Sequence, residues 1–352
     1  MRGWPLLLLL LAGCSGAGEA VDRAGWLQEQ LLLDNQRWLF RDREQLVEKY
    51  DAMEAAPYDW MRGTAALFFA DLARPGTDRL PTAFGADPEA TAVLLLGDPH
   101  PENLGTVPTG EGLTPTEADP SGLVDGSWRT TLEWVDLDAA AWGPWILDLR
   151  RAALGLLLLM DPLDGCDEPC RTAAVEALAA GYADEFAAEE PWDSTEGILG
   201  EWGEVVAKLT EEALEEGLER KRLDKHTTLQ PDGTRTLDVV TELDEEGKGH
   251  IALSALEAEQ LADLMEAYGR TDAAPAGFRY LGGVRRIGSG ISSRPALRFV
   301  VLIDRGDDRD VDDELVQVRE VVDPPVPAGS QSTVTGLFAD NVDRLTRGPD
   351  LL

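Results

Sequence analysis

Histidine and cysteine are both scarce in this sequence, with three of each among 352 residues. The Asp-x-His pattern at residues 98–100 suggests a metallophosphoesterase, but that class needs several more histidine ligands than His226 and His250. The sequence therefore excludes it. Cys166 and Cys170 lack the further soft ligands of a zinc site, so a local disulfide is the preferred interpretation and two free thiols are the alternative.

Basic residues are also few, because 31 lysines and arginines stand against 66 aspartates and glutamates, a formal net charge of -35. Such a charge repels the phosphate backbone of nucleic acids, and we exclude DNA and RNA as partners. We interpret the acidic residues as a solvated surface. The 43% of hydrophobic residues still supply a core for two domains or one large two-lobed domain.

Long hydrophobic runs are missing as well. The leucine run in "MRGWPLLLLLLAGCSG" is about half of what a membrane-spanning helix needs, and its layout is typical of a secretion signal. The letters "LAGC" resemble the lipobox of bacterial lipoproteins. This resemblance implies that residues 1–13 are a cleaved signal peptide and that Cys14 carries a lipid. Ser15 beside it implies an anchor in the cell envelope, on the periplasmic side of the outer membrane. Export also suits a disulfide.

The remaining pattern predicts an α+β protein in two parts, a largely helical one at 14–270 and a smaller strand-rich one at 271–352. Short strands are predicted at 92–96 and in "TLEWVDLD", with a Pro- and Gly-rich insertion at 106–128 between them. Helices are predicted at 22–55, 60–72, 146–160, 171–188, 201–225, 254–268 and 335–348.

Polar side chains follow both short strands. "LLLGDPHPENLG" places Asp98, His100 and Asn103 within six residues, and Asp136 and Asp138 end the next strand. In phosphoryl transfer one aspartate orients the acceptor, while an asparagine and a second aspartate hold magnesium. Asp98 fits the first role and Asn103 with Asp136 the second, and an ordinary turn is the alternative. His100 either braces the turn or contacts substrate, and Asp138 either binds metal or caps the next segment.

A glycine-rich turn lies in the strand-rich part. "RRIGSGISSR" places Gly288 and Gly290 before an apolar strand, and "VQVREV" follows as a strand with Arg319 at its centre. Glycines in a turn let backbone N–H groups approach a phosphate, and a cation on a neighbouring strand can pair with it. The sequence therefore predicts a phosphate-binding turn.

These segments, with "KYDAMEAAPYDWMRGTAALFFADLA" and "VDLDAAAWGPWILDLRR", resemble successive motifs of the bacterial family called domain of unknown function 2252. The resemblance covers roughly residues 45–350. The central motifs are similar in turn to those of aminoglycoside-phosphotransferase-like and other kinase-like enzymes. The resemblance implies a catalytic-loop aspartate at Asp98, metal ligands at Asn103 and Asp136, and a phosphate loop at Gly288 and Gly290.

The resemblance further implies that Asp148 is a buried aspartate that braces the catalytic loop. Because the phosphate loop follows the catalytic loop in the chain, the implied fold is a circularly permuted, two-lobed kinase-like fold with its site between the lobes. Arg319 stands where the family's strand has a lysine, and Ser292 and Ser293 stand where a third glycine is expected. Family members are expected to continue further than Leu352, which implies an incomplete small lobe.

The implied function is phosphotransfer to a hydroxyl of a small molecule or a protein, with Mg²⁺ and a nucleotide as cofactors. The alternative is a catalytically inactive, kinase-like binding or scaffold lipoprotein without a cofactor. ATP is not expected outside the cytoplasm, so an exported enzyme needs a different phosphate donor.

Overall fold

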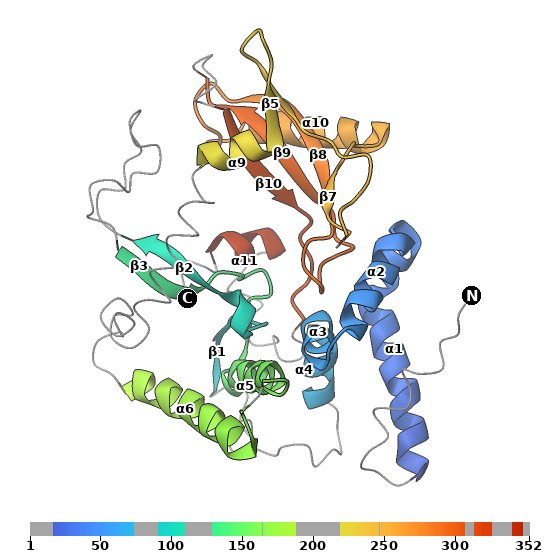
Figure 1. Ribbon diagram of the computed structural model, residues 1–352, viewed down its shortest axis with the longest axis vertical. Helices are drawn as coiled ribbons and strands as arrows, with labels where there is room; N and C mark the ends of the chain where they lie inside the picture. Colours follow the sequence, from blue (N-terminus) through green and yellow to red (C-terminus); the bar gives the residue numbers. More distant parts are fainter. Residues whose placement is uncertain are drawn as a thin grey trace. The chain divides into compact units, whose positions relative to one another are not determined.

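The computed structural model describes residues 17–73, 91–109, 129–163, 165–187, 219–245, 247–306, 313–325 and 340–347. These residues form a mixed α+β structure with small antiparallel sheets, which confirms the predicted α+β class (Figure 1). Contacts along the chain define two compact units. The first comprises Met1–Pro99, Leu137–Asp167 and Val322–Leu352, and the second comprises His100–Asp136 and Glu168–Val321.

This division differs from a boundary at residue 270. β7 (Gly249–Ile251) pairs with β8 (Arg279–Ile287), and α10 (Ala255–Tyr268) packs on β8, so residues on both sides of 270 share the second unit. The helix near the end of the chain, α11 (Asn341–Arg347), belongs to the first unit instead. The division into units depends on strand pairing and packing between segments that are distant in sequence. The composition along the chain does not predict such contacts.

Helices make up most of the described first unit. Asp42 divides the stretch predicted at 22–55 into two helices, because its side chain accepts a hydrogen bond from the Gln45 backbone N–H at 3.2 Å and caps the second one. The stretch predicted at 60–72 is divided at Thr64, which ends the first of its two helices and whose hydroxyl donates to the Trp60 carbonyl oxygen at 2.7 Å. The resulting helices are α1 (Ala17–Arg41), α2 (Arg43–Glu54), α3 (Pro57–Gly63) and α4 (Ala65–Ala73).

The core of the first unit forms around two short strands. β1 (Ala92–Leu95) and β4 (Ala141–Pro144) pair antiparallel, with Leu95 opposite Ala141. Leu95, Ala141 and Phe69 of α4 are buried together there. The β1 strand confirms the prediction at 92–96. The sequence predicts no strand at the position of β4.

α5 (Ile146–Met160) confirms the predicted helix, but its burial pattern is not the one that its leucines indicate. Its buried residues are Arg151 and Gly155, while the leucines are half-buried and Leu159 is exposed. Its apolar composition predicts a buried helix, but the fully buried side chain of α5 is that of Arg151.

The second unit contains a four-stranded antiparallel sheet in the order β10-β9-β8-β7, with β9 (Arg298–Asp304) and β10 (Asp313–Arg319) completing it (Figure 1). α10 begins with a complete capping box between Ser254 and Glu257, and it packs on the sheet through Leu261 and Met265. The predicted strands in this region and the predicted helix at 254–268 are confirmed.

Shorter elements complete the described second unit. The turn between β5 and β6 lies at Asp232 and Gly233, as predicted, with Gly233 at a φ of +87°. Residues 110–128, most of the helix predicted at 201–225, and residues 335–339 of the last predicted helix lie outside the described residues. The elements are β2 (Leu104–Thr109), β3 (Arg129–Trp134), α6 (Glu168–Ala187), α9 (Glu219–His226), β5 (Thr227–Leu229) and β6 (Arg235–Leu237).

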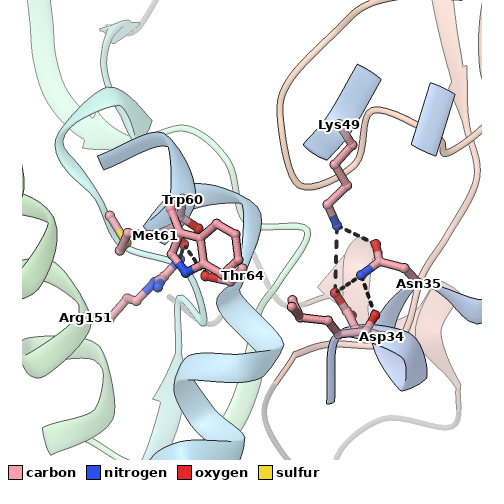
Figure 2. A network of polar contacts seen from close by, with 8 residues as sticks. Asp34, Asn35, Lys49, Trp60, Met61, Thr64 and Arg151 are labelled. Carbon is pink, nitrogen blue, oxygen red and sulfur yellow. Dashed lines mark hydrogen bonds and ion pairs between the residues drawn. The ribbon is translucent and has the colours of Figure 1, made fainter. Parts of the chain in front are cut away.

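A buried amine lies between α1 and α2. The Lys49 side chain is fully buried, its Nζ donates to Asn35 Oδ1 at 2.8 Å, and Asp34 Oδ2 lies 3.7 Å away (Figure 2). The same Nζ lies over the Trp38 ring, 5.2 Å from its centroid. Burial lowers the pKa of Lys49 to about 8, although Asp34 acts in the opposite direction.

Within the described ranges, every helix is too short or too polar to cross a bilayer.

Replacement of Lys49 by methionine tests this cluster. The folded protein releases the Lys49 proton near pH 8 and the unfolded chain near 10.5, so the unfolded state binds more protons between these values. The stability of the wild type relative to Lys49→Met should therefore rise between pH 8 and 10.5, by up to about 1.4 kcal/mol per pH unit. Urea unfolding of both proteins across this range measures it. Lys225→Met, which removes an exposed lysine, is the charge-matched control, and parallel profiles for wild type and Lys49→Met would contradict the expectation.

Candidate functional site

Two aspartates of the predicted site, Asp98 and Asp138, lie beyond the same end of the β1–β4 ladder in the first unit. Beyond the Leu95–Ala141 pair the chain continues to Asp98 on one side, and on the other side Asp138 lies three residues before Ala141. The two segments touch at Gly97, whose φ is +84° and where a Cβ would lie 1.9 Å from the Ala139 carbonyl oxygen. Only glycine fits this close approach, and it fixes the loop that carries Asp98.

Asp148, in the first turn of α5, holds the same loop. Its Oδ2 accepts a hydrogen bond from the Leu96 backbone N–H at 2.6 Å, and its Oδ1 accepts one from the Gly97 N–H at 3.1 Å. These are the contacts that a bracing role requires. The pKa of Asp148 is raised to about 7, mainly by burial and to a smaller extent by Asp98, while the two N–H groups act against the rise.

Arg151 fixes Asp98 itself, and sequence reasoning missed it. The Arg151 side chain is fully buried, and its Nε donates to Asp98 Oδ1 at 2.8 Å. Its Nη2 donates to the Met61 carbonyl oxygen at 2.6 Å, and the guanidinium lies over the Phe68 ring (Figure 2). The sequence does contain one signal for this role. Arg151 stands three residues after Asp148 in an apolar helix, and this spacing puts both side chains on the same helix face.

Arg344 of α11 fixes the segment that carries Asp138, and it too was missed. Its Nη1 donates to the carbonyl oxygens of Asp138 and Ala140, both at 2.8 Å, and its Nη2 donates to Val322 O at 3.2 Å. The Arg344 side chain is buried. A contact across about two hundred residues leaves no local signal in the sequence.

Asn103 and Asp136 lie just beyond one end of the β2–β3 ladder in the second unit. Leu104 pairs with Trp134, and the Asn103 carbonyl oxygen accepts from the Val135 N–H at 2.9 Å, so Asp136 follows directly on the opposite strand. Both side chains are partly exposed. Amide and carboxylate oxygens are suitable magnesium ligands.

His100 lies just before this hairpin end. It is buried, and its carbonyl oxygen accepts from the Asn103 N–H at 2.8 Å, which closes the turn. Within the described ranges, no three side chains of His, Cys, Asp or Glu lie close enough together to hold a metal ion alone.

The glycine-rich turn connects β8 to β9. Gly288 has a φ of +77°, and a Cβ there would lie 2.3 Å from the Gly247 carbonyl oxygen, so backbone packing already requires glycine. Gly290 has a φ of +72° and is exposed. Arg319 ends β10 directly opposite Arg298, the first residue of β9. The predicted phosphate contacts of Gly288, Gly290 and Arg319 stay predictions.

Of the three cysteines with predicted roles, the structure describes two. Cys166 and Cys170 form a disulfide, which is the pairing that the sequence favours. Cys14 lies outside the described residues.

The described geometry thus defines an α+β protein with a braced aspartate loop at a sheet end. The chain matches the family described as "Uncharacterized protein conserved in bacteria (DUF2252)" over residues 41–118 and 121–343. These matches cover most of the chain, and the protein belongs to this family. No curated protein and no solved structure matches it.

Replacement of Asp148 by asparagine should change how stability depends on pH. The folded protein binds the Asp148 proton up to a pH of about 7, whereas the unfolded chain releases it near 3.8. The folded state therefore binds more protons between pH 4 and 7, and this carboxyl makes the wild type less stable as pH rises through that range. Urea unfolding at pH 4.5 to 7.5 should show that the wild type loses stability relative to Asp148→Asn. Asp161→Asn, at the exposed end of α5, is the matched control, and a constant difference between wild type and Asp148→Asn would refute the assignment.

Replacement of Arg151 by methionine should destabilise the first unit strongly. It leaves the Asp98 carboxylate, 14% exposed, and the Met61 carbonyl without their buried donor. Loss of one partner of a buried ion pair costs about 3 to 5 kcal/mol. Denaturant unfolding of Arg151→Met beside Arg150→Met measures this, because both variants remove one arginine from adjacent positions of α5. Equal losses for the two variants would mean that the buried contacts stabilise little.

Proposed function

We propose that this protein is a magnesium-dependent phosphotransferase with a circularly permuted kinase-like fold, and that its acceptor is a hydroxyl of a small molecule or a protein. The observation that carries the proposal is the fixed position of Asp98. The Asp148 carboxylate holds the backbone before it, and the fully buried Arg151 binds its side chain. Preorganisation of this kind is what positions a catalytic group.

Asp98 would accept a hydrogen bond from the acceptor hydroxyl and orient it for attack. The ion pair with Arg151 supports an orienting role, because it fixes the direction of the Asp98 side chain. Asp148 and Arg151 would act through Asp98 as positioning residues.

Asn103 and Asp136 would hold magnesium, with Asp138 as a further oxygen ligand. Magnesium sites use one or two carboxylates, and the phosphates of the substrate and water complete them. The hairpin end that carries Asn103 and Asp136 fits this type of site, which needs no cluster of three acidic residues. The ion would neutralise charge on the transferred phosphoryl group.

Asp98 and Asn103 are five positions apart in the chain, and Asp136 and Asp138 are two positions apart. The Gly288 to Gly290 turn and Arg319 would bind the phosphates of the donor, a nucleotide in the simplest case.

We place the protein at the cell envelope, anchored by a lipid on Cys14. The disulfide between Cys166 and Cys170 supports export, because structural disulfides persist in oxidising compartments.

Calorimetric titration of the full chain with ATP and other nucleotides, with and without magnesium, tests the proposal. Binding should require magnesium and should weaken about tenfold or more in Asp136→Asn, because a metal ligand is lost. Glu133→Gln, which removes an exposed acid from the same strand, should bind like the wild type. Asp98→Asn should keep binding and lose transfer of the labelled γ-phosphate. The absence of nucleotide binding by the folded wild type would favour the inactive binding or scaffold alternative.

A further inference from the structure

Two of the three histidines of the chain meet in the second unit, outside the candidate site. His226 is the last residue of α9, and His250 is the middle residue of β7. Their rings are tilted by 53°, and the ring centroids lie 4.8 Å apart. Two neutral imidazoles tolerate this contact, whereas two imidazolium ions at the same distance repel each other. His226 and His250 are called the histidine pair below.

The charged groups that act on His250 come from three neighbouring elements. They are His226 of α9, Arg286 of β8, which is directly opposite His250 in the strand register, and Asp238, which follows β6. Burial, His226 and Arg286 lower the pKa of His250 from 6.5 to about 4, and Asp238 acts in the opposite direction. His250 is therefore neutral at pH 7.

The strand that carries His250 is short and lies at the edge of its sheet. β7 has three residues, and the sheet order of the described strands places it outermost, next to β8. On its other side the Val240 N–H donates to the His250 carbonyl oxygen at 2.8 Å. A short edge strand opens at a lower free energy than a central strand such as β9. β7 is therefore the part of this sheet that a local repulsion displaces first.

β7 also supports the glycine-rich turn. Gly249 pairs with Ile287, the last residue of β8, and Gly288 follows directly. A Cβ on Gly288 would lie 2.3 Å from the Gly247 carbonyl oxygen and 2.9 Å from the Lys248 Cα, so the turn rests on the backbone just before β7. Displacement of β7 would remove this contact.

We infer that protonation of the histidine pair at acidic pH releases β7 from β8 and frees the Gly288 to Gly290 turn. At neutral pH the uncharged rings pack together and β7 stays paired. At acidic pH two imidazolium ions and the Arg286 guanidinium would lie together beside the Asp238 carboxylate. Opening of β7 separates these cations and returns them to water, which favours the open form.

The direction of the pH dependence follows from the proton on His250. In the closed form His250 binds its proton near pH 4, whereas a histidine exposed to water binds it near 6.5. The open form therefore binds more protons between these values. The equilibrium constant for opening should rise as pH falls through this range, by up to about tenfold per pH unit.

This inference goes beyond the proposed function, because the release requires neither catalysis nor a nucleotide. A loss of donor binding at acidic pH would be its consequence for the candidate site, and that consequence alone rests on the proposed function.

Amide hydrogen exchange of the full chain between pH 7 and 4.5, measured by mass spectrometry, tests the inference. Protection factors corrected for the intrinsic exchange rate at each pH should fall at residues 247–251 and 288–293 together, by about tenfold or more between pH 6.5 and 4.5. Protection of β9, at residues 298–304, should stay constant. The samples contain no nucleotide and no magnesium, so the result is independent of the proposed function.

Variants of the histidine pair identify the group that titrates. His250→Gln cannot become charged and should keep the same protection of β7 at both pH values. In His226→Gln the NMR titration of the His250 ring should give a pKa closer to 6.5 than in the wild type, and the loss of protection should be smaller. Lys225→Gln, which removes the exposed charge next to His226, is the matched control and should behave like the wild type.

Protection at residues 247–251 that does not change with pH in the wild type would overturn the inference, and so would an equal loss in the wild type and His250→Gln. A loss confined to residues 247–251, with residues 288–293 unchanged, would refute the release of the turn. The NMR titration of the wild type decides the question even if His250→Gln does not fold, because a His250 pKa near 6.5 would contradict the closed neutral pair.

Discussion

The ion pair between Arg151 and Asp98 is the contact on which the candidate site depends. A guanidinium cannot lose its charge, so Arg151 can be buried only where acceptors surround it. It finds one on the Asp98 loop and another at the end of α3, in the Met61 carbonyl. The same side chain therefore ties α5, α3 and the loop after β1 into one arrangement. Displacement of any of the three would leave a buried charge uncompensated, which is why Asp98 is held in a single position.

The sequence predicts the elements of the fold that depend on neighbouring residues. It does not predict the contacts between segments that are distant in the chain. Local signals sufficed for the apolar strand before Asp98, the helix that begins near Ser254 and the turn at Asp232 and Gly233, because each depends on neighbouring residues. The carboxylate of Asp148 could be assigned to the Asp98 loop only through the family resemblance. Arg344 and the strand β4 depend on segments distant in sequence, and no local pattern announces them. The leucines of α5 predict a buried apolar helix, but they are half-buried or exposed, and of the two arginines of this helix Arg151 is fully buried.

Electrostatics constrain what the second unit can bind. A net charge of -35 repels polyanions at long range, yet screening limits that repulsion to about 10 Å at moderate salt. Within that range the local charge matters more than the net charge, and residues 279–306 carry six arginines against one aspartate.

Two features that depart from the family pattern meet at Arg298. Ser293 stands near the position of an expected third glycine, and Arg319 stands in place of a lysine. The first accepts a hydrogen bond from Arg298, and the second is its direct partner across the strands. A planar guanidinium offers two parallel N–H groups to phosphate oxygens where a lysine offers a point charge. A serine hydroxyl can orient the neighbouring arginine, which a glycine cannot. The two departures from the family pattern therefore meet in one local arrangement, in which Arg298 contacts the serine and faces the arginine across the strands.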